Sequence, residues 1–75
     1  MKEDFISAQE VVRRFHIPYH TLNYYTMLGI IPIAGKEGNK RLYSLKEVKQ
    51  RLETVMRLSR EGYPLSLIRK KLSHG

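Results

Sequence analysis

The chain has 75 residues, and its 14 lysines and arginines outweigh 7 acidic residues to give a formal net charge of +7. A chain this short has room for one small core and a single domain, residues 1–75, which argues against an enzyme with a deep catalytic pocket. It has no cysteine for disulfides or thiolate metal sites, and no apolar run approaches the roughly 18 residues that a membrane-spanning helix needs. Because excess positive charge is typical of proteins that bind phosphate backbones, we expect a cytoplasmic nucleic-acid-binding domain.

The first predicted helix covers residues 8–15. Ser7 and Glu10 have the spacing of a capping box, in which hydroxyl and carboxylate each bond a backbone N–H at the helix start. Apolar residues recur at helical spacing through the segment. The next three residues, 16–18, end in Pro18, which disfavours helical geometry in the residue before it and can itself begin a helix. The sequence therefore predicts a short turn into a second helix.

The second predicted helix covers residues 19–28 and ends at Gly29, a residue type that readily takes the left-handed conformation after a helix. At about 100° per residue, its side chains divide between two faces. The face expected to pack holds Leu22, Tyr25 and Leu28, with Pro18 and Thr21 beside them. The face expected to point outward holds His20, Asn23, Tyr24 and Met27. Since a helix fits the major groove and an asparagine amide can pair with an adenine edge, the outward face is the predicted base-reading surface.

Residues 33–43 are predicted to form a small, basic, two-stranded hairpin. Glycine and asparagine lie at its centre, and strand-favouring residues follow them. Its cations are Lys36, Lys40 and Arg41. We expect them to be flexible and to reach phosphates or the adjacent minor groove, where they add affinity more than sequence choice.

Two further helices are predicted, over residues 45–61 and 65–72. The first opens with a second capping box and ends at Gly62. Its apolar face is predicted to comprise Leu45, Val48, Leu52, Val55 and Met56, with Ser59 at the margin. Arg57 and Arg60 lie near its end, and we expect them to hold phosphate on the flank opposite the hairpin. The order of all these elements predicts a mainly α, winged helix-turn-helix fold with four helices and a two-stranded wing.

Four motifs, in this order, closely resemble the DNA-binding domain of MerR-type regulators. They read TLNYY at 21–25, LGIIP at 28–32, RLYS at 41–44 and EGYPL at 61–65, and the resemblance covers roughly residues 5–72. It implies transcription regulation, with Arg41 and Tyr43 as wing residues at the DNA. The chain departs from the family pattern at Asn23, where an arginine that contacts DNA is usual, so we expect an altered sequence preference.

The resemblance also implies a two-fold symmetric operator at a promoter and a homodimer held by a long helix after the fourth one. The sequence ends at Gly75 without that helix. We therefore expect an N-terminal fragment of a longer regulator that is monomeric by itself, and a naturally minimal protein is the alternative. Family members sense their effectors through segments beyond this domain, so the resemblance implies no particular signal.

The predicted DNA-contacting residues are His20, Thr21, Asn23, Tyr24, Lys36, Lys40, Arg41, Tyr43, Arg57 and Arg60. No catalytic residue and no cofactor are expected. A metal site at the histidine pair 16 and 20 is not expected either, because Pro18 separates the two residues and no third ligand lies nearby. Two alternatives remain open at the level of sequence. One is an excisionase-like architectural protein that bends DNA, and the other is a small interaction module whose basic face meets an acidic partner.

Overall fold

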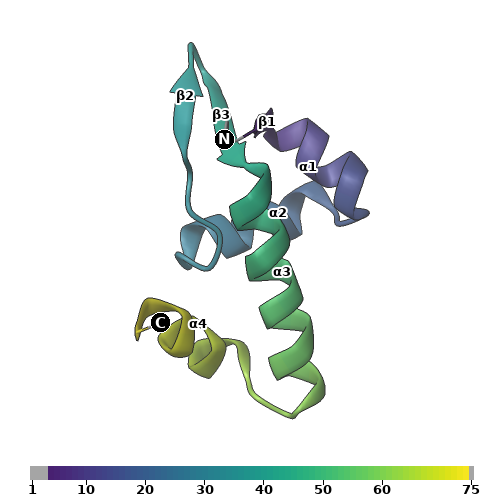
Figure 1. Cartoon of the computed structure of the whole chain (residues 1–75), viewed down its shortest axis with the longest axis vertical. Coiled ribbons are helices and arrows are strands. Elements are labelled where there is room, and N and C mark those ends of the chain that lie inside the picture. The colour runs from purple at the N-terminus through teal and green to yellow at the C-terminus, as the bar shows by residue number, and fades with distance from the viewer. Residues whose placement is uncertain (1–3, 75) are drawn as a thin grey trace.

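The computed structural model of the chain describes residues 4–74, apart from the side chains of residues 73 and 74. Its elements are β1 (Phe5–Ser7), α1 (Ala8–Phe15), α2 (Tyr19–Met27), β2 (Gly35–Glu37), β3 (Lys40–Ser44), α3 (Leu45–Arg60) and α4 (Leu65–His74) (Figure 1). The described part of the chain thus contains four helices and a small antiparallel sheet. The mainly α, winged helix-turn-helix prediction is confirmed.

The sheet has three strands in the order β1-β3-β2, one more than the predicted wing. The additional strand, β1, pairs antiparallel with β3 so that Ile6 lies opposite Tyr43. A segment of three residues is too short for an alternating pattern to reveal a strand. Its extended form is fixed instead by pairing with a strand more than thirty residues away in the sequence.

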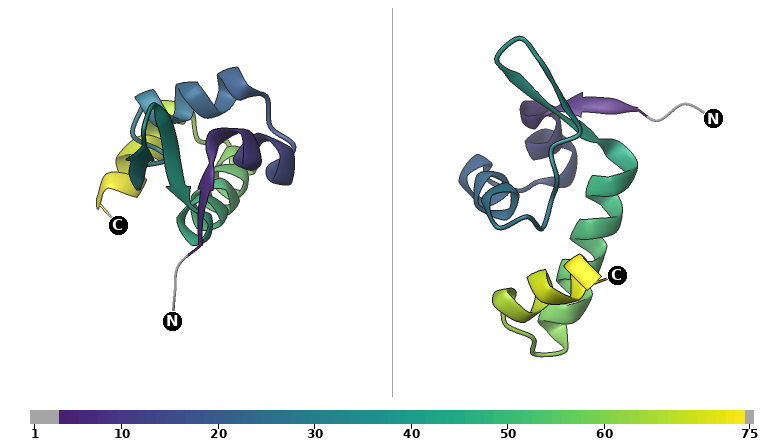
Figure 2. Two further views of the ribbon diagram at one scale, coloured as in Figure 1. Left: turned by 90° about the horizontal axis from the view of Figure 1, so that it is seen from above. Right: turned by 90° about the vertical axis from the view of Figure 1, so that its left-hand side faces the viewer.

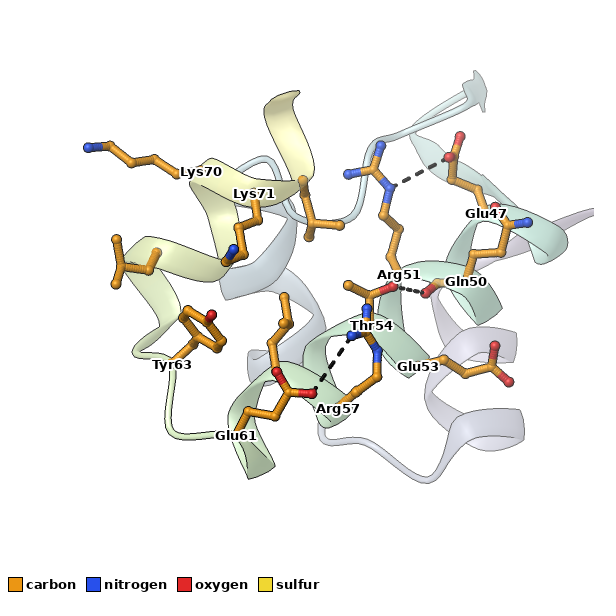
Figure 3. A pocket seen from close by; sticks show the side chains of 13 residues that line it. Glu47, Gln50, Arg51, Glu53, Thr54, Arg57, Glu61, Tyr63, Lys70 and Lys71 are labelled. Carbon is orange, nitrogen blue, oxygen red and sulfur yellow. Dashed lines mark hydrogen bonds and ion pairs between the residues drawn. The ribbon is translucent and has the colours of Figure 1, made fainter. Parts of the chain in front are cut away.

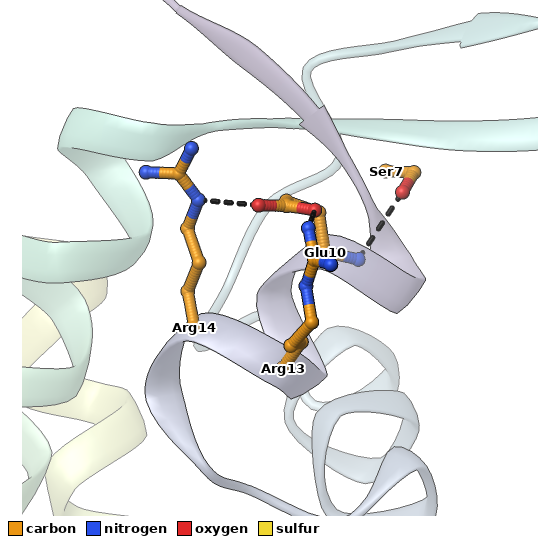
Figure 4. A network of polar contacts seen from close by, with 4 residues as sticks. All are labelled: Ser7, Glu10, Arg13 and Arg14. Atoms are coloured by element: carbon orange, nitrogen blue, oxygen red, sulfur yellow. Dashed lines mark hydrogen bonds and ion pairs between the residues drawn. The ribbon is translucent and has the colours of Figure 1, made fainter.

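Helices α1 and α3 begin at the predicted serine caps. The Ser7 hydroxyl oxygen accepts from the backbone N–H of Glu10 at 3.2 Å, and Ser44 does the same for Glu47 at 3.2 Å. The Glu10 carboxylate, however, accepts from the Arg13 and Arg14 side chains rather than from the backbone of Ser7 (Figure 4). The hydrogen bond from Arg14 lowers the pKa of Glu10, so this carboxyl stays ionised in more acidic solution than an isolated glutamate.

The turns before and after α2 have different backbone conformations. Before α2, His16 takes the left-handed conformation with φ 55°, and Pro18 caps the helix in an extended conformation. After α2, Gly29 has φ 81° and donates to the Thr26 carbonyl oxygen at 3.1 Å, while Ile30 donates to the Tyr25 carbonyl oxygen at 2.9 Å. This pair of bonds is a Schellman motif, as the glycine predicted. It turns the chain back so that Ile30 is fully buried.

One hydrophobic core joins all the helices to the sheet. Its buried members are Val11, Leu22, Ile30, Ile31, Tyr43, Val48, Leu52, Val55, Leu58 and Ile68. The prediction for the end of α3 was wrong, since Met56 is 57% exposed, Ser59 is exposed and Leu58 is buried instead. Around the axis of α3, residues 56 and 58 project at similar angles on either side of buried Val48. The packing of α4 decides between them, because Leu58 lies in the groove where α4 meets α3.

The hairpin of β2 and β3 projects beyond the helices at one end of the molecule, and the turn between α3 and α4 lies at the other end (Figures 1 and 2). Helix α2 lies between these two ends (Figure 1). Within residues 4–74, no helix combines the length and the apolar character that crossing a membrane requires.

Candidate nucleic-acid interface

The wing arginine, Arg41, is held against α2. Its Nη1 donates to the Asn23 side-chain oxygen Oδ1 at 3.0 Å, and its Nη2 donates to the Tyr19 hydroxyl at 2.8 Å. Its guanidinium carbon lies 5.7 Å from the centre of the Tyr19 ring and 5.8 Å from that of Tyr43, within the range of cation–π attraction. The side chain is half-buried. The expectation that Arg41 is a freely flexible cation is therefore wrong.

Two simple periodicities bring this cluster together. Tyr19 and Asn23 are four residues apart on α2 and therefore lie one above the other on the same face. Arg41 and Tyr43 are two residues apart on β3 and therefore point to the same side of the sheet. Tyr19 was not among the predicted contact residues. The four-residue spacing between Tyr19 and Asn23 is the sequence signal that could have identified Tyr19 as part of this cluster.

Tyr43 lies beneath Arg41 and is fully buried, with 0% of its side chain exposed. Its hydroxyl lies 2.9 Å from Thr26 Oγ1. Thr26 uses its own hydrogen on the Leu22 carbonyl oxygen at 2.8 Å, so the tyrosine is the donor in this pair. The prediction that Tyr43 contacts DNA is corrected, because a side chain with no exposed surface cannot reach a phosphate. Tyr43 instead supports the guanidinium above it.

Burial agrees with the predicted two faces of α2 except at Pro18, which is exposed although it was expected beside the packed face. Leu22 is fully buried, and Tyr25 and Leu28 are half-buried against the core. On the other face Tyr24 is 53% exposed, Met27 is 78% exposed and His20 is exposed. Asn23 and Thr21 lie at the boundary and are half-buried. The outward face therefore combines hydroxyl, imidazole, amide and thioether groups with no acidic residue among them.

The remaining wing cations are exposed. Lys36 lies opposite Arg41 in the β2–β3 pairing, and Lys40 lies opposite Glu37. Lys40 and Arg41 also line a small hollow where the wing meets the start of α1, whose other lining residues are Ser7, Ala8, Gln9, Tyr19 and Asn39. Positive charge therefore runs along the wing, starting at Arg41 beside α2.

Arg57 and Arg60 are not brought to this cluster. They occupy the last turn of α3, at the end of the molecule away from the wing (Figure 1). Arg57 lies 3.8 Å from Glu61 and lines the groove between α3 and α4, whereas Arg60 is exposed (Figure 3). The groove carries both signs of charge, from Glu47, Glu53, Glu61, Arg51, Arg57, Lys70 and Lys71. The phosphate contacts of Arg57 and Arg60 stay predictions.

Comparison with known proteins agrees with this arrangement. Residues 6–75 match the model of a family described as MerR HTH family regulatory protein. Comparisons with curated proteins and with solved structures found no match. The family match covers the helix-turn-helix pair, the wing and the two helices that follow. The chain therefore belongs to the MerR family of helix-turn-helix regulatory proteins.

Proposed function

We propose that this chain binds double-stranded DNA sequence-specifically in transcription regulation, with α2 in the major groove and the wing on the flanking backbone. The observation that carries the proposal is the attachment of Arg41 to Tyr19 and Asn23. This cluster joins the basic wing to the outward face of α2, so that the two form one continuous surface. A surface of this kind can contact bases and neighbouring phosphates at the same time.

The exposed groups of α2 suit the edges of base pairs. Tyr24 and His20 can donate or accept hydrogen bonds, and Met27 offers an apolar contact to a thymine methyl group. Thr21, half-buried near the helix start, can contact the backbone beside them. The absence of acidic residues in α2 removes a source of repulsion from phosphate.

The wing supplies charge for the backbone. A guanidinium group has five N–H donors, and Arg41 uses two of them on Tyr19 and Asn23, which leaves donors for a phosphate. Lys36 and Lys40 are exposed beside it. Because phosphate contacts release counterions, binding through this wing depends strongly on salt.

The operator is proposed to be palindromic, as expected for a regulator that acts as a homodimer. Each subunit of the proposed homodimer binds one half-site. No effector is assigned, since family members differ in what they sense.

The test is a comparison of two duplexes of equal length, one recovered by selection from a randomised library and one with the same bases scrambled. By fluorescence anisotropy at about 150 mM salt, the chain is expected to bind the selected duplex at least about 10-fold more tightly. The slope of log affinity against log salt is expected near −3, for about three to four phosphate contacts. Equal affinity for both duplexes would contradict sequence-specific binding.

A further inference from the structure

We infer that Arg41 fixes the orientation of the Asn23 amide, so that Asn23 offers only N–H donors to DNA and selects guanine over adenine at one base pair. This inference rests on the proposed function and names a specificity determinant within it. It differs from the expectation drawn from the sequence, in which a free asparagine amide would read adenine. Arg41 is here a positioning residue, because it acts on the base through Asn23.

The orientation follows from which atoms can donate. A guanidinium group carries donors and no acceptor, so the atom 3.0 Å from Arg41 Nη1 must be the amide oxygen of Asn23. The flipped amide would place two sets of N–H hydrogens against each other. The chemistry of the partner therefore settles an assignment that asparagine geometry alone leaves ambiguous.

The amide nitrogen is free to meet a ligand. Within residues 4–74, Asn23 Nδ2 has no hydrogen-bond partner, while Oδ1 is engaged by Arg41. No buried side-chain nitrogen or oxygen lacks a partner among these residues, so Nδ2 must be open to solvent. Asn23 is half-buried on the outward side of α2, next to exposed Tyr24. Its two N–H donors are thus the part of the amide without a partner, whereas Oδ1 is turned toward Arg41.

The guanidinium group is held from several sides. Tyr19 both accepts its hydrogen bond at 2.8 Å and lies 5.7 Å away as a ring, and the Tyr43 ring lies 5.8 Å away. Tyr43 is itself fixed by burial and by its bond to Thr26. Because these contacts oppose rotation of Arg41, the amide of Asn23 meets DNA in one preset orientation.

The base edges distinguish the two orientations. In the major groove guanine presents two acceptors, whereas adenine presents one acceptor and one donor, and cytosine presents a donor. A group that offers only N–H donors matches guanine best and meets the adenine amino group unfavourably. A free amide, which has both a donor and an acceptor, matches adenine instead.

The experiment is selection from a randomised duplex library at low salt, followed by sequencing, with the wild-type chain and three variants. Asn23→Asp keeps an oxygen for Arg41 but replaces the outward donor with an acceptor. Arg41→Ala releases the amide. Lys40→Ala is the matched control, since it removes one wing charge next to Arg41 and leaves the contact with Asn23 in place.

The wild-type chain is expected to favour guanine at one position by about 5- to 100-fold. Asn23→Asp is expected to change that position to cytosine and Arg41→Ala to change it to adenine, with the other positions preserved. Lys40→Ala is expected to weaken binding and to keep guanine. The same base at that position in the wild type, Asn23→Asp and Arg41→Ala would overturn the inference, as would adenine in the wild type.

A readout without DNA separates this inference from the proposed function. Because a carboxylate accepts hydrogen bonds more strongly than an amide, Asn23→Asp is expected to raise the Tm of the free chain. The same substitution is expected to raise the Tm less in a chain that also carries Arg41→Ala. An equal change in both backgrounds would show that the contact is absent and would overturn the inference. A coupled change in Tm, with no sequence enriched by the wild type, would instead reject sequence-specific binding and with it the preference for guanine.

Discussion

Arg41→Ala is expected to weaken binding to the selected duplex about 50-fold, a loss of about 2–3 kcal/mol. Three effects act in the same direction. The substitution removes a charge that faces the DNA backbone, breaks the bonds that join the wing to Tyr19 and Asn23, and lets the Asn23 amide rotate. Anisotropy titrations of the selected and scrambled duplexes at one salt concentration measure the loss.

Two comparisons show whether charge alone explains this result. Arg41→Lys keeps the charge but loses the planar, two-point geometry, so we expect it to recover only part of the affinity. Lys49→Ala removes an equal charge from an exposed position on α3, outside α2 and the wing, and is expected to change the affinity less than about twofold. Equal losses for Arg41→Ala and Lys49→Ala would reduce the role of Arg41 to net charge.

Tyr43→Ala is expected to remove about 3–5 kcal/mol from the free energy of unfolding. The side chain is among the largest fully buried ones, and its loss leaves a cavity between β3 and α2 and removes the donor to the Thr26 hydroxyl oxygen. A domain of this size has a total stability of only about 4–11 kcal/mol. Urea denaturation followed by circular dichroism measures the change, and much of the variant is expected to be unfolded at 37 °C.

Tyr43→Phe tests the corrected position of this residue. It keeps the ring beside Arg41 and removes only the buried hydroxyl, so we expect a loss of stability of about 1 kcal/mol and nearly unchanged affinity for the selected duplex. If this variant kept its stability but bound DNA much more weakly, the hydroxyl would be a DNA contact and its burial would be contradicted.

Local signals predicted the elements that local chemistry determines. The two serine caps and Gly29 each act through backbone groups within a few residues, so their positions could be inferred from the sequence. The packed face of α2, with Leu22 buried and Tyr25 half-buried, could be inferred from helical spacing in the same way.

Long-range contacts decided what the sequence could not predict. Strand β1 exists because β3 pairs with it, and Met56 is exposed because α4 covers the Leu58 side of α3. The largest difference between the prediction and the structure concerns Arg41, which the sequence predicts to be a mobile cation of the wing. Tyr19 and Asn23, which contact Arg41, lie about twenty residues before it in the sequence. No local sequence pattern predicts contacts over that separation.

The outward face of α2 and the wing are proposed to form the DNA-binding surface together. The most direct test is to follow the NMR signals of the ¹⁵N-labelled chain as the selected duplex is added. We expect the largest changes at Asn23, Tyr24 and Met27 on α2 and at the wing, including the Arg41 side chain, with small changes around exposed Leu67 on α4. Changes concentrated in the groove between α3 and α4, with α2 unaffected, would show that DNA binds elsewhere.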